Sequence, residues 1–104
     1  MSGGSDKTEK PTPKRLREAR LRAGLSQKQL GIQAGIDELS ASARVNQYER
    51  GKHMPDLQTL TRLATILGTP VPYFYCEDPE LADFIARFPS LSRAQRRKLS
   101  RTVD

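Results

Sequence analysis

The sequence predicts an all-α protein, for three reasons. Apolar residues recur at intervals of three and four in several short segments, which is the spacing of one helix face. Glycine follows most of these segments, where a helix would end. No segment alternates apolar and polar residues over the length of a strand. With 104 residues the chain has the usual size of one small domain, and we expect five short helices around one core.

The first two helices are expected in the N-terminal part of the chain. Thr12 can cap the first helix with its hydroxyl group, and Gly24 is placed to end it. Ser26, followed three residues later by Gln29, forms the capping-box pattern that starts a second helix. Gly35 then supplies the positive φ that a sharp turn requires.

The third helix is expected at about residues 41–49, with Val45 and Tyr48 on its buried face. Ser40 is the cap that we expect for this helix. A helix that extends back to Asp37 is the alternative.

Two further helical segments complete the domain. A fourth helix is expected after Asp56, where leucines recur at helical spacing up to Gly68. A short fifth turn of helix follows at residues 71–75. Its three aromatic side chains could stack on nucleotides, but packing against the core is the simpler interpretation.

The chain divides into three parts. Residues 1–11 have almost no apolar side chains and are expected to form a flexible N-terminal arm. Residues 12–76 hold the five helices, and residues 77–104 are expected to form a C-terminal extension of two helices. The second of these is basic, and the first carries an apolar stripe. The stripe consists of Leu81, Phe84, Ile85 and Phe88.

Three roles are open for this extension. The apolar stripe can dock on the domain of its own chain, form the interface of a homodimer, or bind a protein partner through residues 79–104. The mass in solution of the full chain and of a chain ending at residue 78 would distinguish these roles.

The charge of the chain favours a polyanion as its partner. The formal net charge is +6 and the isoelectric point is about 9.9, values typical of proteins that bind nucleic acid. The basic residues gather at the two ends: seven Lys and Arg against three acids in residues 1–25, and six against two in residues 81–104.

Several classes of protein are excluded by what the sequence lacks. The single cysteine, Cys76, and the single histidine, His53, make no metal site of known spacing, and no cofactor is expected. No apolar run approaches the about 18 residues of a membrane span, so we expect a cytoplasmic protein with no membrane partner. Neither a P-loop nor a nucleophile beside a general base is present, and no enzyme is expected.

The residues between the second and third helices have the spacing of a helix-turn-helix motif. Gly31 lies where two crossing helices need a small side chain, and Gly35 lies where the chain must turn. Val45 and Tyr48 would bury the third helix against the second. In such a motif the second helix lies in the major groove of DNA, and the first braces it against the phosphate backbone.

On these residues the chain resembles the phage-repressor-like (lambda-repressor-like, XRE-type) helix-turn-helix family. The stretch "RLREARLRAGLSQKQL" is similar to the first two helices of the family. The stretch "RVNQYERGKHMPDLQTLTRLATILGTPVPYFY" is similar to its recognition helix and the leucine-rich helix that follows. The resemblance covers about residues 14–75 and implies a five-helix DNA-binding domain whose recognition helix is residues 41–49.

The chain departs from the family pattern at two places. Gly31 stands where the family usually has alanine. Residues Asp37 to Ser40 add four residues to the usual turn, which puts the start of the recognition helix in question. Two of the added residues are acidic, and they must be held away from the phosphates for the helix to enter the groove.

The resemblance implies DNA-binding roles for three groups of side chains. Base edges are expected to be read by Ser42, Ala43, Arg44, Asn46 and Gln47. Phosphate contacts are expected from Gln27, Arg50 and Lys52. A structural salt bridge is expected between Arg20 and Glu49. Arg44 could donate two hydrogen bonds to guanine, and Asn46 or Gln47 could pair with adenine.

The implied function is sequence-specific binding of double-stranded DNA by a transcriptional regulator that acts as a repressor. Domains of this kind usually bind pseudo-palindromic sites as homodimers. The alternative is a protein-interaction module of the same fold, such as an antitoxin or an adaptor, that uses the extension to hold a partner.

Overall fold

The computed structural model describes residues 10–103, which form helices and turns without a strand. The all-α prediction is confirmed for this part of the chain. The expected arm at residues 1–11 lies outside the described residues, except for Lys10 and Pro11. The elements are α2 (Thr12–Arg22), α3 (Gln27–Gln33), α4 (Glu38–Glu49), α5 (Leu57–Leu67), the 3-10 helix η1 (Val71–Tyr75), α6 (Pro79–Arg87), the 3-10 turn η2 (Phe88–Ser90) and α7 (Arg93–Thr102).

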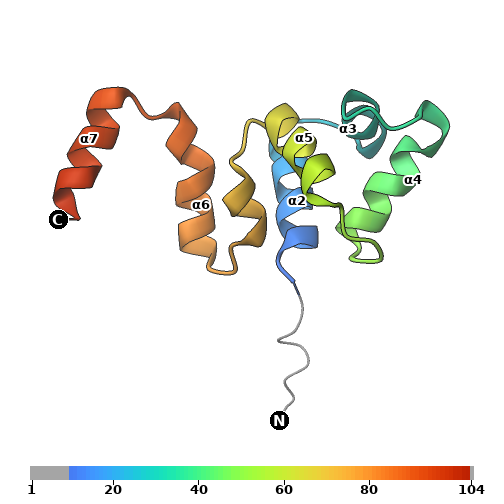
Figure 1. Cartoon of the computed structure of the whole chain (residues 1–104), viewed down its shortest axis with the longest axis horizontal. Helices are drawn as coiled ribbons and strands as arrows, with labels where there is room; N and C mark the ends of the chain where they lie inside the picture. The colour runs from blue at the N-terminus through green and yellow to red at the C-terminus, as the bar shows by residue number, and fades with distance from the viewer. Residues whose placement is uncertain (1–9, 104) are drawn as a thin grey trace, which may run out of the picture.

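The hydrophobic core lies where α2, α3, α4, α5 and η1 meet. In Figure 1, α2 runs through the middle of the molecule, with α3 and α4 on one side and η1 and α6 on the other. The largest fully buried apolar side chains are Leu16, Leu30, Val45, Leu60, Leu63, Tyr73 and Phe74. Val45 and Tyr48 are buried as the sequence predicts, so the inner face of α4 is the expected one.

Of the caps expected for the first two helices, Ser26 is observed and Thr12 is not. The side chain of Ser26 accepts a hydrogen bond from the amide of Gln29, and the Gln29 side chain accepts from the amide of Ser26. The carboxylate of Asp56 accepts from the amide of Thr59 at the start of α5. The expected Thr12 cap is wrong, because the buried Thr12 hydroxyl instead donates to the carbonyl oxygen of Phe74 over 2.7 Å. This bond ties α2 to η1.

The start expected for the third helix at Ser40 is wrong, and the alternative, a helix that extends back to Asp37, is the one observed. α4 begins at Glu38, three residues before position 41, and its cap is Asp37 rather than Ser40. The Asp37 carboxylate accepts a hydrogen bond from the amide of Leu39 over 3.0 Å. Four inserted residues are close to the 3.6 residues of one helical turn, and a negative side chain in the first turn favours the helix dipole. The insertion is therefore accommodated as an additional turn at the N-terminus of α4.

The additional turn brings Ala41 against α3. An ideal Cβ atom built on Gly31 would lie 2.7 Å from the Cβ atom of Ala41 and 2.9 Å from its carbonyl oxygen. These distances are shorter than carbon and oxygen contacts allow, so α3 and α4 cross at a contact that only glycine fits. The glycine that replaces the usual alanine of the family and the inserted turn therefore belong together.

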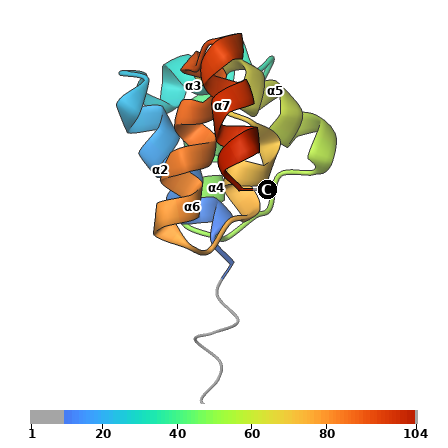
Figure 2. The same ribbon diagram turned by 90° about the vertical axis from the view of Figure 1, so that its left-hand side faces the viewer.

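The C-terminal extension packs on the domain with small side chains. Ala82 of α6 is buried, and Ile85 and Ala86 are partly buried against the core. Leu81, Phe84 and Phe88, the other members of the apolar stripe, are exposed. α7 projects away from the other helices and lies at the opposite end of the molecule from α4 (Figure 1). Figure 2 looks from that end and shows α7 in front of the other helices.

None of the described helices is long and apolar enough to cross a membrane.

Candidate nucleic-acid interface

A buried ion pair fixes α4 to α2. Arg20 donates from Nε to Glu49 Oε2 over 2.5 Å and from Nη2 to Glu49 Oε1 over 3.1 Å, and its Nη1 donates to the carbonyl oxygen of Leu25. The Glu49 side chain is only 3% exposed. A bidentate pair with both partners held in this way sets the orientation of the C-terminal end of α4.

Gln27, at the first position of α3, links this ion pair to the outer face of α4. Its amide Nε2 donates to Glu49 Oε1 over 3.1 Å and to Asn46 Oδ1 over 3.2 Å. The bond to Asn46 uses the carbonyl oxygen of that side chain, so its NH₂ group keeps its donors for another partner. Gln27, expected on sequence grounds to contact phosphate, also orients Asn46, which the sequence did not indicate.

The outer face of α4 carries the residues that were expected to read bases. Ser42, Ala43 and Arg44 are exposed, whereas Asn46 and Gln47 are half-buried. Ala43 lies opposite the buried Val45, and Leu39 and Asn46 follow it at helical spacing along one flank of the outer face. Arg44 lies on the other flank, because Arg44 and Asn46 stand on either side of Val45 in the sequence. Leu39 joins the face because α4 starts one turn earlier than expected.

The two inserted acids have partners within the protein. The carboxylate of Asp37 accepts the hydrogen bond from Leu39 that caps α4. Glu38 lies 3.7 Å from the ammonium group of Lys28 on α3, in an exposed ion pair. Both residues are exposed, and each carboxylate has a partner within the protein.

The segment after α4 presents two cations. Gly51 adopts a left-handed conformation with φ of 75°, which allows the amide of Lys52 to donate back to the carbonyl oxygen of Gln47 over 2.9 Å. Arg50 and Lys52 are both exposed. The same turn lies beside Pro13, whose Cγ atom is 3.5 Å from an ideal Cβ atom on Gly51. The start of α2 and the end of α4 therefore lie side by side.

The basic character of the first helix is partly structural. Arg15 is 4% exposed. Its guanidinium donates to the carbonyl oxygens of Cys76 and Glu77 and forms an ion pair with Glu18. With Arg20 also buried, two of the arginines that raise the charge of the N-terminal segment hold the fold together. A count of charges cannot detect this, because it does not use the helical spacing that places both side chains on the same face as Leu16 and Ala19.

The aromatic segment at 71–75 packs into the core, as the simpler interpretation expected. Tyr73 and Phe74 are buried and only Tyr75 is exposed. Burial raises the pKa of Tyr73 above its ordinary value, and its hydroxyl donates to Glu18. This segment presents no row of aromatic side chains on which bases could stack. Among residues 10–103, no group of three or more His, Cys, Asp and Glu side chains could hold a metal ion.

Comparison with known proteins agrees with this arrangement. A family model described as a helix-turn-helix domain matches residues 14–72, which is more than half of the chain. The chain therefore belongs to the helix-turn-helix family of DNA-binding domains, as its resemblance predicted. Among curated protein sequences, none is significantly similar to it.

One solved structure is similar over nearly the whole chain. The crystal structure of the transcriptional regulator BswR shares 48% sequence identity, covers 88% of this chain and 90% of its own chain, and superposes with a TM-score of 0.84. Since 88% of the chain is more than residues 1–76 contain, the similarity continues into the C-terminal extension.

Proposed function

We propose that the protein is a transcriptional regulator that binds a specific sequence of double-stranded DNA, with α4 in the major groove. The observation that carries this proposal is the outer face of α4, which is exposed and polar while its inner face is locked to α2 and α3. A rigidly held helix with free donors and acceptors is what base recognition requires. The similarity to BswR supports the regulatory role.

The side chains divide into readers and anchors. Arg44, Asn46 and Gln47 carry donors that reach base edges, and Ser42 and Ala43 lie close to them. Arg50 and Lys52, beyond the end of α4, contact phosphate and fix the register without reading the sequence. Both hydrogens of the Gln27 NH₂ group are donated to Glu49 and Asn46, so the phosphate contact of Gln27 is assigned to its backbone amide at the first position of α3.

Selection from a library of randomised DNA duplexes tests this proposal. We expect a preferred sequence whose affinity exceeds that of random DNA by roughly a thousandfold or more. Arg44→Ala should change the preferred bases, while Lys52→Ala should weaken binding to every sequence and reduce the salt dependence by the release of about one counterion. If no sequence is preferred by more than about tenfold, the proposed function is wrong.

The regulator is proposed to act as a cytoplasmic repressor and as a homodimer on a two-fold symmetric site. Two copies related by a two-fold axis would read half-sites separated by about one helical turn of DNA or a multiple of it. The selected sequences report this directly, because a dimer enriches inverted repeats of constant spacing. A reporter gene placed behind the selected site should lose expression when the protein is present, and increased expression would overturn the repressor role.

A second candidate function has one observation in its favour. The extension carries exposed apolar side chains at the end of the molecule opposite α4, which a monomeric DNA-binding domain does not need. An antitoxin or adaptor would use residues 79–104 to hold a partner protein. Retention of full DNA selectivity by a chain that ends at residue 78 would favour this candidate over a regulator that requires its own dimer.

A further inference from the structure

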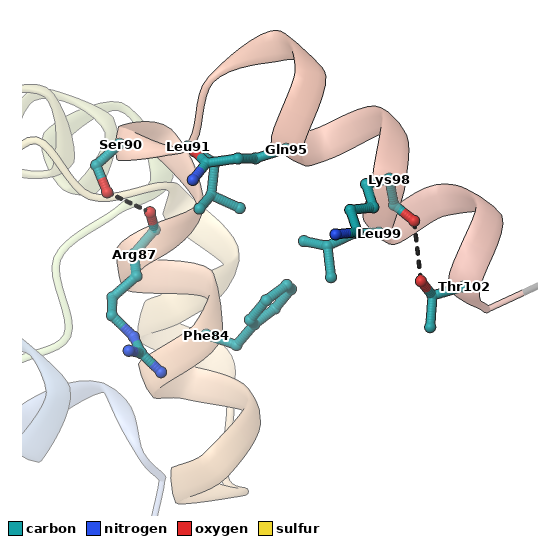
Figure 3. A pocket seen from close by; sticks show the side chains of 8 residues that line it. All are labelled: Phe84, Arg87, Ser90, Leu91, Gln95, Lys98, Leu99 and Thr102. Atoms are coloured by element: carbon teal, nitrogen blue, oxygen red, sulfur yellow. Dashed lines mark hydrogen bonds between the residues drawn. The ribbon is translucent and has the colours of Figure 1, made fainter.

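The helices α6 and α7 form a groove that the described residues leave open. Its volume is about 450 Å³, and its apolar lining comes from Phe84 of α6, Leu91 of the connecting turn and Leu99 of α7. Figure 3 shows the Phe84 ring and the Leu99 side chain pointing into the same space from the two helices. Their side chains do not close the gap, so the groove presents apolar surface to water.

The groove is held open by contacts at the bend between the two helices. Arg96 of α7 donates to the carbonyl oxygens of Phe88 and Pro89, and its guanidinium lies 4.5 Å from the centre of the Phe88 ring. Ser92 and Gln95 close a capping box at the start of α7. These contacts set the direction in which α7 leaves the body, so the space between α6 and α7 is part of the fold.

α7 lacks the support that a helix of its length needs. It has 10 residues, and isolated helices below about 12–15 residues are only marginally stable in water. All its side chains are exposed except the half-buried Leu99, and its packing against the other described helices is slight. A stable α7 therefore requires a surface from outside the described chain.

The charges of the extension indicate what that surface is. Residues 77–87, which end with the last residue of α6, carry four acids, Glu77, Asp78, Glu80 and Asp83, and one base, Arg87, which pairs with Asp83. α7 carries five bases and no acid, namely Arg93, Arg96, Arg97, Lys98 and Arg101. Two copies of α7 repel each other, whereas α7 of one copy is complementary to α6 of another.

We propose that the groove is filled by a second copy of this chain, with α7 of each protomer lying against α6 of its partner. The contact is self-complementary, as a two-fold axis demands, and the four helices enclose Phe84 and Leu99 of both copies as a four-helix bundle does. This inference identifies the interface of the homodimer. It rests on the proposed function for the role of that dimer in binding DNA. α4, at the other end of each protomer, stays free for DNA (Figure 1).

Sedimentation of the full chain without DNA tests the interface. We expect a mass of twice the 11.7 kDa of one chain over a dilution series, and a Tm that rises with concentration. Phe84→Glu and, separately, Leu99→Glu should raise the dimer dissociation constant by about 30-fold or more, the effect of removing a central interface residue. Their helical circular dichroism should fall by no more than the contribution of α7, because neither side chain belongs to the core.

The matched control is Leu21→Glu, at a leucine of α2 that is 53% exposed. This variant should keep the mass and the concentration dependence of the wild type. A monomeric wild type would overturn the proposal. In that case either α7 packs on α6 of its own chain or the groove binds a helix of another protein. A dimer that both groove variants leave intact would also overturn the proposal. Because no DNA is present, a dimer without selective DNA binding would refute only the proposed function.

A different observation, at the start of α4, carries a second inference. Leu39 is 94% exposed, the most exposed of the large apolar side chains described. It lies one turn before Ala43 on the outer face of α4, in the turn that the insertion adds. The one apolar group that base pairs display in the major groove is the methyl group of thymine. We infer, on the basis of the proposed function, that Leu39 contacts a thymine methyl group and helps to select the bases of the operator.

Replacement of each thymine of the selected site by uracil, one at a time, tests this inference. At one position the wild type should lose about fourfold in affinity, the value of one buried methyl group. Leu39→Ala should bind the thymine and uracil duplexes equally, while Leu57→Ala, at another exposed leucine, should still distinguish them. If the wild type binds selectively but no uracil substitution matters, or Leu39→Ala distinguishes as well as the wild type, this inference is refuted and the proposed function stands.

Discussion

Gly31→Ala tests the crossing of α3 and α4 most directly. Alanine in the interior of an exposed helix normally stabilises a protein by about 1 kcal/mol relative to glycine. Here the added Cβ atom would lie 2.7 Å from the Cβ atom of Ala41 and 2.9 Å from its backbone oxygen, where carbon atoms need about 3.5 Å or more. Because one of the two neighbours is backbone, a side-chain rotation cannot relieve the overlap.

The magnitude follows from these opposing effects. Moving apart two packed helices costs about 1–3 kcal/mol, so the net change in the free energy of unfolding is a loss of about 1–2 kcal/mol after the gain in helix propensity. For a chain of this size, each kcal/mol lowers Tm by about 4–8 °C. Thermal unfolding followed by circular dichroism at a fixed protein concentration measures this change.

The same helix offers a matched control for Gly31→Ala. Gln33→Ala, at an exposed position of the same helix, should change stability by no more than about 0.5 kcal/mol. Adding Ala41→Gly to Gly31→Ala removes the closest contact, so the two changes together should be less destabilising than the sum of each alone. An increase in Tm for Gly31→Ala would show that the helices are not in contact at this point, and the account of the insertion would be wrong.

Two further predictions concern the ion pair and the cap of α5. Glu49→Gln should lower the free energy of unfolding by about 3–5 kcal/mol, because it leaves the charge of Arg20 buried without its partner. Asp83→Asn, which breaks an exposed ion pair, should lower it by less than about 1 kcal/mol in urea unfolding. Equal losses in the two variants would contradict the structural role of the buried pair. The hydrogen bond from the Thr59 amide holds the pKa of Asp56 below its ordinary value. Its stabilisation is complete above the ordinary pKa of about 3.9 and is lost as the pH falls through the lower folded value. The difference in Tm between wild type and Asp56→Asn should therefore shrink as the pH falls below the ordinary pKa, and a difference that stays constant with pH would refute this assignment.

The start of α4 bears on the proposed binding of DNA. If α4 is the recognition helix, as proposed, its N-terminal end contains the inserted turn. Its acids are engaged with the amide of Leu39 and with Lys28, and its exposed apolar side chain is Leu39. An operator for this protein is therefore expected to differ from those of relatives that lack the insertion.

The sequence alone determined the class of fold, the family and the positions of most helices. Periodic apolar residues and the glycines that follow them are local signals, and each depends on residues within one turn of the chain. The family could be identified because Val45, Tyr48 and Gly51 keep fixed offsets from one another after the insertion, as Gly31 and Gly35 do before it. The buried face of α4 was predictable for the same reason.

Only the tertiary structure decided where α4 starts, which arginines are buried and which side of α6 faces out. Asp37 and Ser40 are both good caps, and the choice between them depends on whether a neighbouring helix makes room, which Gly31 does. Arg15 was not expected to be buried, because the carbonyl oxygens of Cys76 and Glu77 that bind it come from a distant segment; for Arg20, only the family resemblance indicated a structural partner, Glu49. Likewise the sequence shows one apolar stripe on α6 and does not tell which part of the helix is buried. In the structure α6 packs closely on η1, and this contact buries Ala82 and leaves Phe84 exposed. Contacts between distant segments carry no periodic signal, and these contacts determine which residues remain free to bind DNA or a second copy.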